Sequence, residues 1–193
     1  MLFNSRVKNK TSFMTEADAL ALENMIDENS RVLIIGAGLI GLKCAEGLSG
    51  RVKEITVCDL ADRVLSSILD EECAGIVAEK LVQNGIKLML ADTAESFDAN
   101  TAKMKSGKTV EFDVLVTAVG VRPNVSLLRD AGAEVNRGVL VNDKMETSLS
   151  DIYAAGDLTE ARDSSSGMKK IMAILPNAYV GGYCAGCNMA GAE

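Results

Sequence analysis

Histidine is absent from this 193-residue chain. Any catalytic mechanism within the chain that depends on an imidazole is therefore excluded, including serine and cysteine triads. Long apolar runs are also missing, and none reaches the roughly 20 residues that a bilayer-spanning helix needs. The first ten residues carry cations with no apolar segment behind them, so we expect no signal peptide.

Positive charge is in deficit. Lysine and arginine total 20 against 27 acidic residues, which gives a net charge of −7. The cations are not gathered into a stripe, so nucleic acid is not an expected partner. The five cysteines are odd in number and scattered, which favours a reducing cytoplasm over a disulfide framework. We therefore expect a cytoplasmic protein that does not enter a membrane.

Two cysteines, Cys184 and Cys187, have the C-x-x-C spacing of redox dithiols and of half a zinc site. They fall in the middle of an expected helix, and neither a second such pair nor a histidine completes a set of metal ligands. The sequence therefore predicts structural cysteines and no metal. The same interpretation, small residues in or near the core, applies to Cys44, Cys58 and Cys73.

Among what is present, the segment from Arg31 to Glu46 is the most informative. It predicts a buried strand, a G-x-G-x-x-G turn and the start of a helix, the arrangement that holds a dinucleotide pyrophosphate. The first glycine permits the tight turn, the second lets the backbone approach the phosphates, and the third lets the helix pack closely on the strand. The helix start adds free N–H groups and a partial positive charge. The predicted pyrophosphate site comprises Gly36, Gly38, Leu39, Ile40 and Gly41; the alternative is a purely structural turn.

A carboxylate follows the next predicted strand, over residues 54–58, at Asp59. It lies about 20 residues beyond the glycines, where an acid accepts hydrogen bonds from the adenosine ribose. Such a carboxylate would repel a 2′-phosphate, so we predict NAD(H) rather than NADP(H). Two alternatives stay open: Asp59 caps the loop that follows it, and Arg63, the nearest cation in sequence, meets a phosphate.

Periodicity and turn residues predict the order of the other elements. A helix is expected over 15–26 and another over 70–84, with strands at 86–90 and 113–120. Short alternating stretches at 94–97, 102–105 and 109–112 predict an antiparallel meander in place of the next βαβ unit. The predicted fold class is thus α/β, a Rossmann-like doubly wound parallel sheet with a small antiparallel β-meander. It would span residues 15–124, after an N-terminal extension over residues 1–14.

The remaining residues, 125–193, contain a second signature. A short strand is expected at 137–141, and a small-residue strand is expected to end in Gly156 and Asp157. An acceptor carboxylate beside a closely approachable backbone suits the polyol hydroxyls of a nucleotide or a flavin. An ordinary turn is an equally good explanation of these two residues alone.

Taken together, five segments resemble the FAD-dependent pyridine nucleotide–disulfide oxidoreductase superfamily: residues 36–46, 55–65, 113–124, 138–157 and 177–191. The branch that they resemble most contains NADH oxidases, coenzyme A disulfide reductases, the nitrite reductase FAD module and NADH:rubredoxin reductases. In that family the NAD domain is inserted within the FAD domain. The resemblance implies that residues 125–193 are the C-terminal part of an FAD-binding domain.

The resemblance also assigns roles to residues. Asp157, beside Gly156, would hold a ribityl hydroxyl of FAD, and a helix from about residue 176 would point its N-terminus at the flavin. Val119 and Gly120 would line the nicotinamide side. Two positions depart from the pattern, because Lys43 stands where many relatives have a glutamate and Leu39 where many have an aromatic residue.

The resemblance implies, finally, that the chain is a fragment, because the family's first Gly-rich loop is missing. The expected function is the NADH-binding portion of a flavoprotein that passes hydride from NADH to FAD and on to oxygen, a disulfide or a small redox protein. The fragment alone is expected to be inactive. Its expected partners are the missing half of the FAD domain and, through exposed apolar area, a second copy. Alternatives are a non-catalytic NAD-binding sensor or scaffold and a flavin-free dehydrogenase, the latter weakened by the absence of histidine and of a Tyr-x-x-x-Lys pair.

Overall fold

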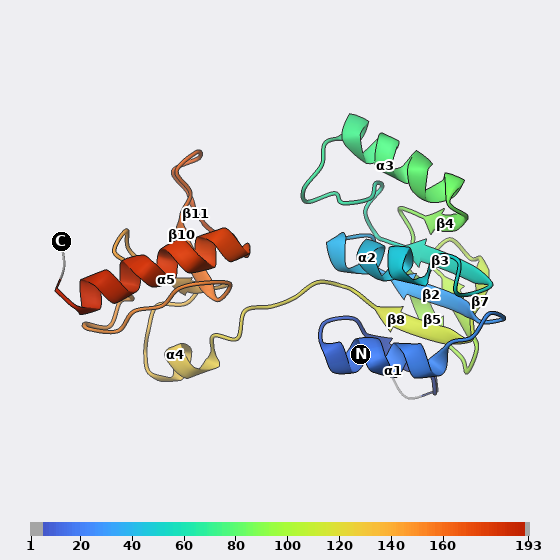
Figure 1. Cartoon of the computed structure of the whole chain (residues 1–193), viewed down its shortest axis with the longest axis horizontal. Coiled ribbons are helices and arrows are strands. Elements are labelled where there is room, and N and C mark those ends of the chain that lie inside the picture. Colours follow the sequence, from blue (N-terminus) through green and yellow to red (C-terminus); the bar gives the residue numbers. More distant parts are fainter. Residues whose placement is uncertain (1–5, 192–193) are drawn as a thin grey trace. The chain divides into compact units, whose positions relative to one another are not determined.

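The computed structural model describes residues 6–191 and divides into two compact units, one up to Gly120 and one from Val121 onward (Figure 1). Residues 1–5 of the predicted extension and residues 192–193 lie outside the described residues. Each unit has its own hydrophobic core.

A five-stranded parallel sheet forms the centre of the first unit. Its central strands read as continuous apolar runs, as a parallel sheet covered on both faces requires. In spatial order the strands are β1 (Lys10–Ser12), β8 (Val114–Thr117), β2 (Arg31–Ile35), β3 (Glu54–Cys58) and β4 (Ile86–Met89).

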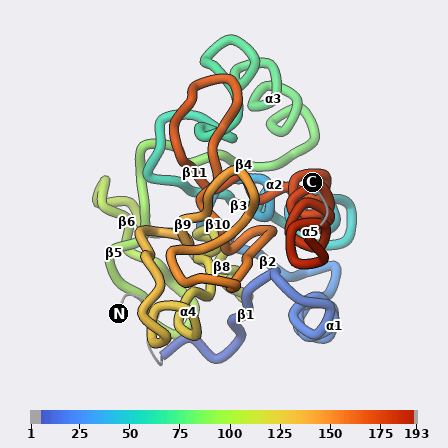
Figure 2. Tube along the Cα trace, turned by 90° about the vertical axis from the view of Figure 1, so that its left-hand side faces the viewer, coloured from blue at the N-terminus to red at the C-terminus, as the bar shows by residue number. Residues whose placement is uncertain are grey.

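Different layers cover the two faces of this sheet. One face packs against α1 (Glu16–Met25), α2 (Leu39–Leu48) and α3 (Glu71–Gln83). The other packs against an antiparallel meander of β5 (Ala94–Phe97), β6 (Thr101–Met104) and β7 (Thr109–Glu111). Figure 2 shows α1 and α2 on one side of the sheet and β5 and β6 on the other. The predicted parallel sheet with an antiparallel meander is confirmed.

Helix ends fall where the capping residues predict them. Thr15 accepts a hydrogen bond from the backbone N–H of Asp18, whose side chain bonds back to the N-cap, so α1 begins with a capping box. Asp70 caps α3 through the N–H of Cys73 at 2.9 Å. Gly85 has a φ of +81° just past the end of α3, the conformation that favours glycine at a helix C-terminus.

The N-terminal segment contains a strand that the sequence analysis did not anticipate. Strand β1 pairs with β8, Lys10 lying opposite Leu115, and Val7 is buried in the core beneath the meander. Only three residues long and at the sheet edge, β1 is held by backbone pairing rather than by a buried face. Its sequence therefore lacks the apolar alternation by which a strand is recognised.

The second unit is a small mixed sheet with a long helix. Strand β10 (Thr159–Arg162) pairs in parallel with β9 (Val139–Leu140) and antiparallel with β11 (Lys169–Ile171). A short helix, α4 (Ser126–Asp130), precedes the sheet and α5 (Leu175–Met189) follows it. The prediction of a helix from about residue 176 matches α5, which carries Pro176 in its first turn.

One strand prediction in this unit is wrong. The small residues before Gly156 form no strand, and Tyr153 makes only an isolated bridge to Glu146. A strand needs a neighbour to pair with, and within residues 6–191 both edges of β10 are already taken by β9 and β11. No helix among the described residues is both long and apolar enough to cross a membrane.

Candidate dinucleotide-binding site

The carboxyl ends of β2, β3 and β8 meet at one edge of the sheet. Ile35, the last residue of β2, lies opposite Cys58 of β3 and Thr117 of β8. The residues that follow are therefore brought together. Gly36 donates its N–H to the carbonyl of Cys58 at 2.7 Å, and Ala118 donates to the carbonyl of Ile35 at 2.8 Å. The predicted residues Gly36, Asp59, Val119 and Gly120 thus follow aligned strand ends.

Two of the three glycines are required by the fold itself. Gly36 has a φ of +113°, and a Cβ there would lie 2.3 Å from the carbonyl oxygen of Ala118. A Cβ at Gly41 would lie 2.0 Å from the carbonyl oxygen of Gly36. Close backbone packing between turn, helix and neighbouring strand therefore excludes any side chain at both positions.

Gly38 differs from these two because nothing in the protein lies near it. Its φ is −79°, which any residue can adopt, and no atom lies within 4 Å of a Cβ built there. The open space beside its backbone is where a bound group can approach. The residues present therefore fit a pyrophosphate, for which the second glycine of the motif is needed.

The start of α2 leaves donors available at the same place. Gly38 is the N-cap and has no side chain to accept a hydrogen bond. The first-turn N–H groups, including those of Leu39 and Ile40, therefore have no side-chain acceptor from the cap. These groups carry the positive end of the helix dipole, which favours a bound anion. Leu39 is 58% exposed beside them. Lys43, one turn further on, forms an exposed ion pair with Glu46 at 2.6 Å.

Asp59 holds the glycine turn in place. Its carboxylate accepts a hydrogen bond from the N–H of Ala37 at 2.6 Å and another from the N–H of Ala61 at 2.8 Å. The second contact is the loop cap that the sequence left open as an alternative. Each carboxylate oxygen has two acceptor sites, and Asp59 is half-buried, so it retains capacity for a ligand hydroxyl. Arg63 is bonded locally, to Asp62 at 3.2 Å and to the carbonyl of Ser66 at 3.4 Å.

Two residues of this edge were missed by the sequence analysis. Ala118 presents the carbonyl against which Gly36 packs, and Leu65 donates its N–H to the carbonyl of Ala37 at 2.9 Å. A small residue at the end of the strand beside a glycine turn is a signal that could have identified Ala118. Val119, 64% exposed, and Gly120, with a φ of +88°, follow it where the chain leaves the sheet.

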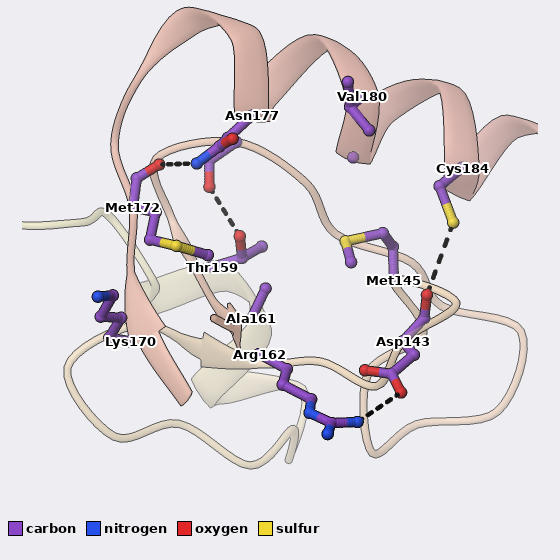
Figure 3. Close-up of a pocket in the computed structure, with 12 residues that line it drawn as sticks. Asp143, Met145, Thr159, Ala161, Arg162, Lys170, Met172, Asn177, Val180 and Cys184 are labelled. Carbon is purple, nitrogen blue, oxygen red and sulfur yellow. Dashed lines mark hydrogen bonds and ion pairs between the residues drawn. The ribbon is translucent and has the colours of Figure 1, made fainter. Parts of the chain in front are cut away.

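The residues predicted to face a flavin line two different cavities of the second unit. Gly156, with a φ of +84°, lines a cavity of about 260 Å³ between α5 and the β10–β11 hairpin (Figure 3). The carbonyl of Gly156 accepts hydrogen bonds from Thr159, and Asn177 reaches the carbonyl of Met172 at 3.4 Å. Asp157 is exposed and lines a neighbouring groove of about 720 Å³.

The cysteines do not form a reactive set. Burial raises the pKa of both Cys44 and Cys58 to about 12, so these thiols stay protonated. Cys184 points from α5 toward the carbonyl of Asp143 at 3.7 Å (Figure 3). The prediction that Cys73 lies in or near the core is wrong: it is exposed, because the third position of α3 faces solvent, and its backbone N–H donates to the cap residue Asp70.

One model of a known protein family covers most of the chain. The model described as pyridine nucleotide-disulphide oxidoreductase matches residues 4–182. The chain belongs to this family. The predicted resemblance is thereby confirmed.

Relatives in this family are considerably longer than the chain. An NADH oxidase of Methanocaldococcus jannaschii is 37% identical over 185 residues, which cover 93% of this chain and 41% of the relative. An NAD(P)H sulfur oxidoreductase (CoA-dependent) of Pyrococcus furiosus is 33% identical over 91% of this chain and 41% of its own length. The chain thus spans less than half the length of these pyridine nucleotide-disulphide oxidoreductases.

Solved structures of the family share the fold. An NAD-dependent persulfide reductase of A. fulgidus superposes with a TM-score of 0.90 at 30% identity, over 97% of this chain and 36% of that protein. The water-forming NADH oxidase of Lactobacillus brevis, solved with NADH bound, gives a TM-score of 0.86 at 27% identity, over 94% of this chain and 41% of that one.

Proposed function

We propose that this chain is the NADH-binding portion of a flavoprotein oxidoreductase. The observation that carries the proposal is the open space beside Gly38, at the uncapped start of α2. The family's name specifies a pyridine nucleotide, and one of the similar structures was solved with NADH. In this proposal the predicted NAD-binding domain, residues 15–124, corresponds to the first unit, which also contains β1 and ends at Gly120, and the predicted C-terminal part of an FAD-binding domain, residues 125–193, corresponds to the second unit.

Each residue of the sheet edge has a role in this proposal. The pyrophosphate is held by backbone N–H groups at the start of α2, and Asp59 accepts from the adenosine ribose with its remaining acceptor sites. The same carboxylate disfavours a 2′-phosphate, so the cofactor is NADH rather than NADPH. Val119 and Gly120 lie on the nicotinamide side. The pyrophosphate contacts come from Gly36, Gly38, Leu39, Ile40 and Gly41.

The second unit supplies a smaller contribution. Asp157 forms no hydrogen bond within residues 6–191, so its carboxylate is available to a ribityl hydroxyl of FAD, beside the turn at Gly156. In the whole protein, bound NADH would supply a hydride that passes to FAD and then to an acceptor. Hydride transfer requires alignment rather than a proton donor, which agrees with a chain that has no histidine. This chain alone is expected to be inactive.

Calorimetric titration of the chain with NADH tests the site. Gly38→Ala should weaken binding by about tenfold or more, because the added methyl group keeps the phosphates away from the backbone. Gly47→Ala is the matched control: Gly47 lies near the other end of α2 and, like Gly38, has no atom within 4 Å of a Cβ. Equal affinities of Gly38→Ala and the unmodified chain would contradict the proposal.

The cofactor preference is tested by repeating the titration with NADPH. We expect NADPH to bind more weakly than NADH. Equal affinity for the two cofactors would contradict the proposal that Asp59 repels a 2′-phosphate. The presence of flavin is tested on the longer native protein by visible absorbance. Its proposed activity is tested by measuring NADH oxidation with oxygen, a disulfide or rubredoxin as the acceptor. A native protein that never carries flavin would leave an NAD-binding sensor or scaffold in place of an oxidoreductase.

A further inference from the structure

Three arginines of the second unit line one groove. Arg122, Arg129 and Arg137 surround a space of about 540 Å³, and all three are exposed. No carboxylate lines this groove. The rest of its wall is neutral and consists of Pro123, Asn124, Val125 and Ser126.

These three arginines differ from the others in the chain. Within residues 6–191 they form neither an ion pair nor a side-chain hydrogen bond. Every other arginine is paired with a carboxylate: Arg6, Arg31, Arg51, Arg63 and Arg162. In a chain with fewer cations than anions, the unpaired guanidinium groups are therefore collected at a single place.

A buried carboxylate, Glu160, bonds to the backbone of Arg137 but does not line this groove; it lines the neighbouring groove, which Arg122 and Arg137 also line. Glu160 already accepts the backbone N–H groups of Arg137 and Gly138, both at 2.9 Å. Burial would raise the pKa of Glu160, but these hydrogen bonds and the charge of Arg137 hold that pKa below its usual value. The carboxylate is thus ionised and accepts hydrogen bonds from N–H groups of residues 136–138, and the guanidinium of Arg137 forms no direct ion pair with it.

An anion bound among these three like charges would reduce their mutual repulsion. Guanidinium groups match the oxygens of phosphate and carboxylate in a planar, two-pronged geometry. One carboxylate, with two oxygens and a single charge, matches one guanidinium. Three guanidinium groups require more oxygens and more charge, which a phosphate group supplies.

We propose that the groove binds a phosphate-bearing anion with at least two negative charges, held by Arg122, Arg129 and Arg137. The side chains of Asn124 and Ser126, on the same wall, provide additional polar contacts. The site lies wholly within the second unit and shares no residue with the glycine turn. It does not rest on the proposed binding of NADH.

Calorimetric titration of the 193-residue chain with inorganic pyrophosphate at low ionic strength tests the proposal. We expect saturable binding that Arg129→Gln weakens about tenfold, the usual effect of losing hydrogen bonds to a charged group. Arg122→Gln provides a second variant at the same groove. The control is Arg6→Gln, which removes the same charge from an exposed arginine paired with Asp98 and should change affinity by less than about twofold.

Two further ligands identify the source of the phosphate. ADP binding that Arg129→Gln also weakens would support a nucleotide-borne phosphate, whereas an effect on pyrophosphate alone would support a free polyphosphate. Binding of ADP at the glycine turn would be insensitive to Arg129, so the two sites are distinguished. The proposal is overturned if pyrophosphate does not bind, if Arg6→Gln weakens binding equally, or if a hexaglutamate peptide binds more tightly than pyrophosphate. The last result would assign the groove to an acidic protein surface.

Discussion

At the scale of single residues, the glycines of the G-x-G-x-x-G turn do two different things. Gly36 and Gly41 are needed because the turn, α2 and the end of β8 approach one another too closely for any Cβ. Gly38 meets nothing within the protein, so its lack of a side chain has no structural explanation in the described chain. The space beside this second glycine of the motif leaves room for a ligand to approach the backbone, and this contrast with Gly36 and Gly41 supports the proposed site.

Gly41→Ala should destabilise the chain. A Cβ 2.0 Å from the carbonyl oxygen of Gly36 must displace α2 from β2, and overpacking of this kind costs about 1–3 kcal/mol. Gly47→Ala in the same helix has no such contact and should gain up to about 1 kcal/mol from helix propensity. Urea denaturation of both variants measures the difference. A Gly41→Ala variant as stable as Gly47→Ala would contradict the close approach of Gly41 to the carbonyl of Gly36.

At the scale of elements, an ion pair joins strands that are far apart in sequence. Arg31 begins β2, and its guanidinium bonds to Asp113, just before β8, at 2.9 and 3.0 Å. It also contacts Glu111 of β7. The hydrogen bonds and charge of Arg31 hold the pKa of Asp113 below its usual value, although partial burial acts in the opposite direction. The pair fixes the start of β2 against β8.

Asp113→Asn should lower the free energy of unfolding at pH 7 by about 1 kcal/mol. This is less than a fully buried ion pair would contribute, because the Asp113 side chain is 38% exposed and solvent screens the pair. The pKa of Asp113 is lower in the folded chain than in the unfolded one. Its stabilisation is therefore complete above the unfolded value of about 3.9 and is lost as the pH falls through the folded value. Denaturation curves from pH 7 downward should show the two proteins converging. Asp98→Asn, at a more exposed pair, serves as the control, and a constant difference at all pH values would contradict the assignment.

At the scale of the whole molecule, α5 has one face with no cover among the described residues. Leu175, Tyr179 and Tyr183 recur every four residues, and they are 83%, 77% and 70% exposed. The opposite face packs on its own unit through Gly181 and Ala185. Exposed apolar area of this kind favours association, so we expect the isolated chain to form oligomers.

Light scattering at increasing concentration measures this association. The double variant Leu175→Ser with Tyr179→Ser should remain monomeric at concentrations where the unmodified chain associates, because it removes apolar area from the α5 face. Leu127→Ser, at an equally exposed position on α4, is the control and should leave association unchanged. An unmodified chain that stays monomeric throughout would disprove the expectation.

Local signals predicted elements wherever those signals are strong. The apolar runs of β2, β3 and β8 and the caps at Thr15, Asp70 and Gly85 identified strands and helix ends directly. Two other predictions failed. Strand β1 was not anticipated, and the strand predicted before Gly156 does not form. Pairing of an edge strand depends on a partner about 100 residues distant, which no local pattern records.

By itself the sequence determined the α/β class, the order of the main elements, the glycine turn and the family. Each of these can be recognised from the pattern of residues within short segments of the chain. Only the tertiary structure decided which glycine of the turn has open space beside it, that Asp59 bonds to the turn through the N–H of Ala37, and that Arg122, Arg129 and Arg137 share one groove. The physical reason is that the first group depends on local propensity and burial, while the second depends on which backbone and side-chain atoms meet after the chain has folded.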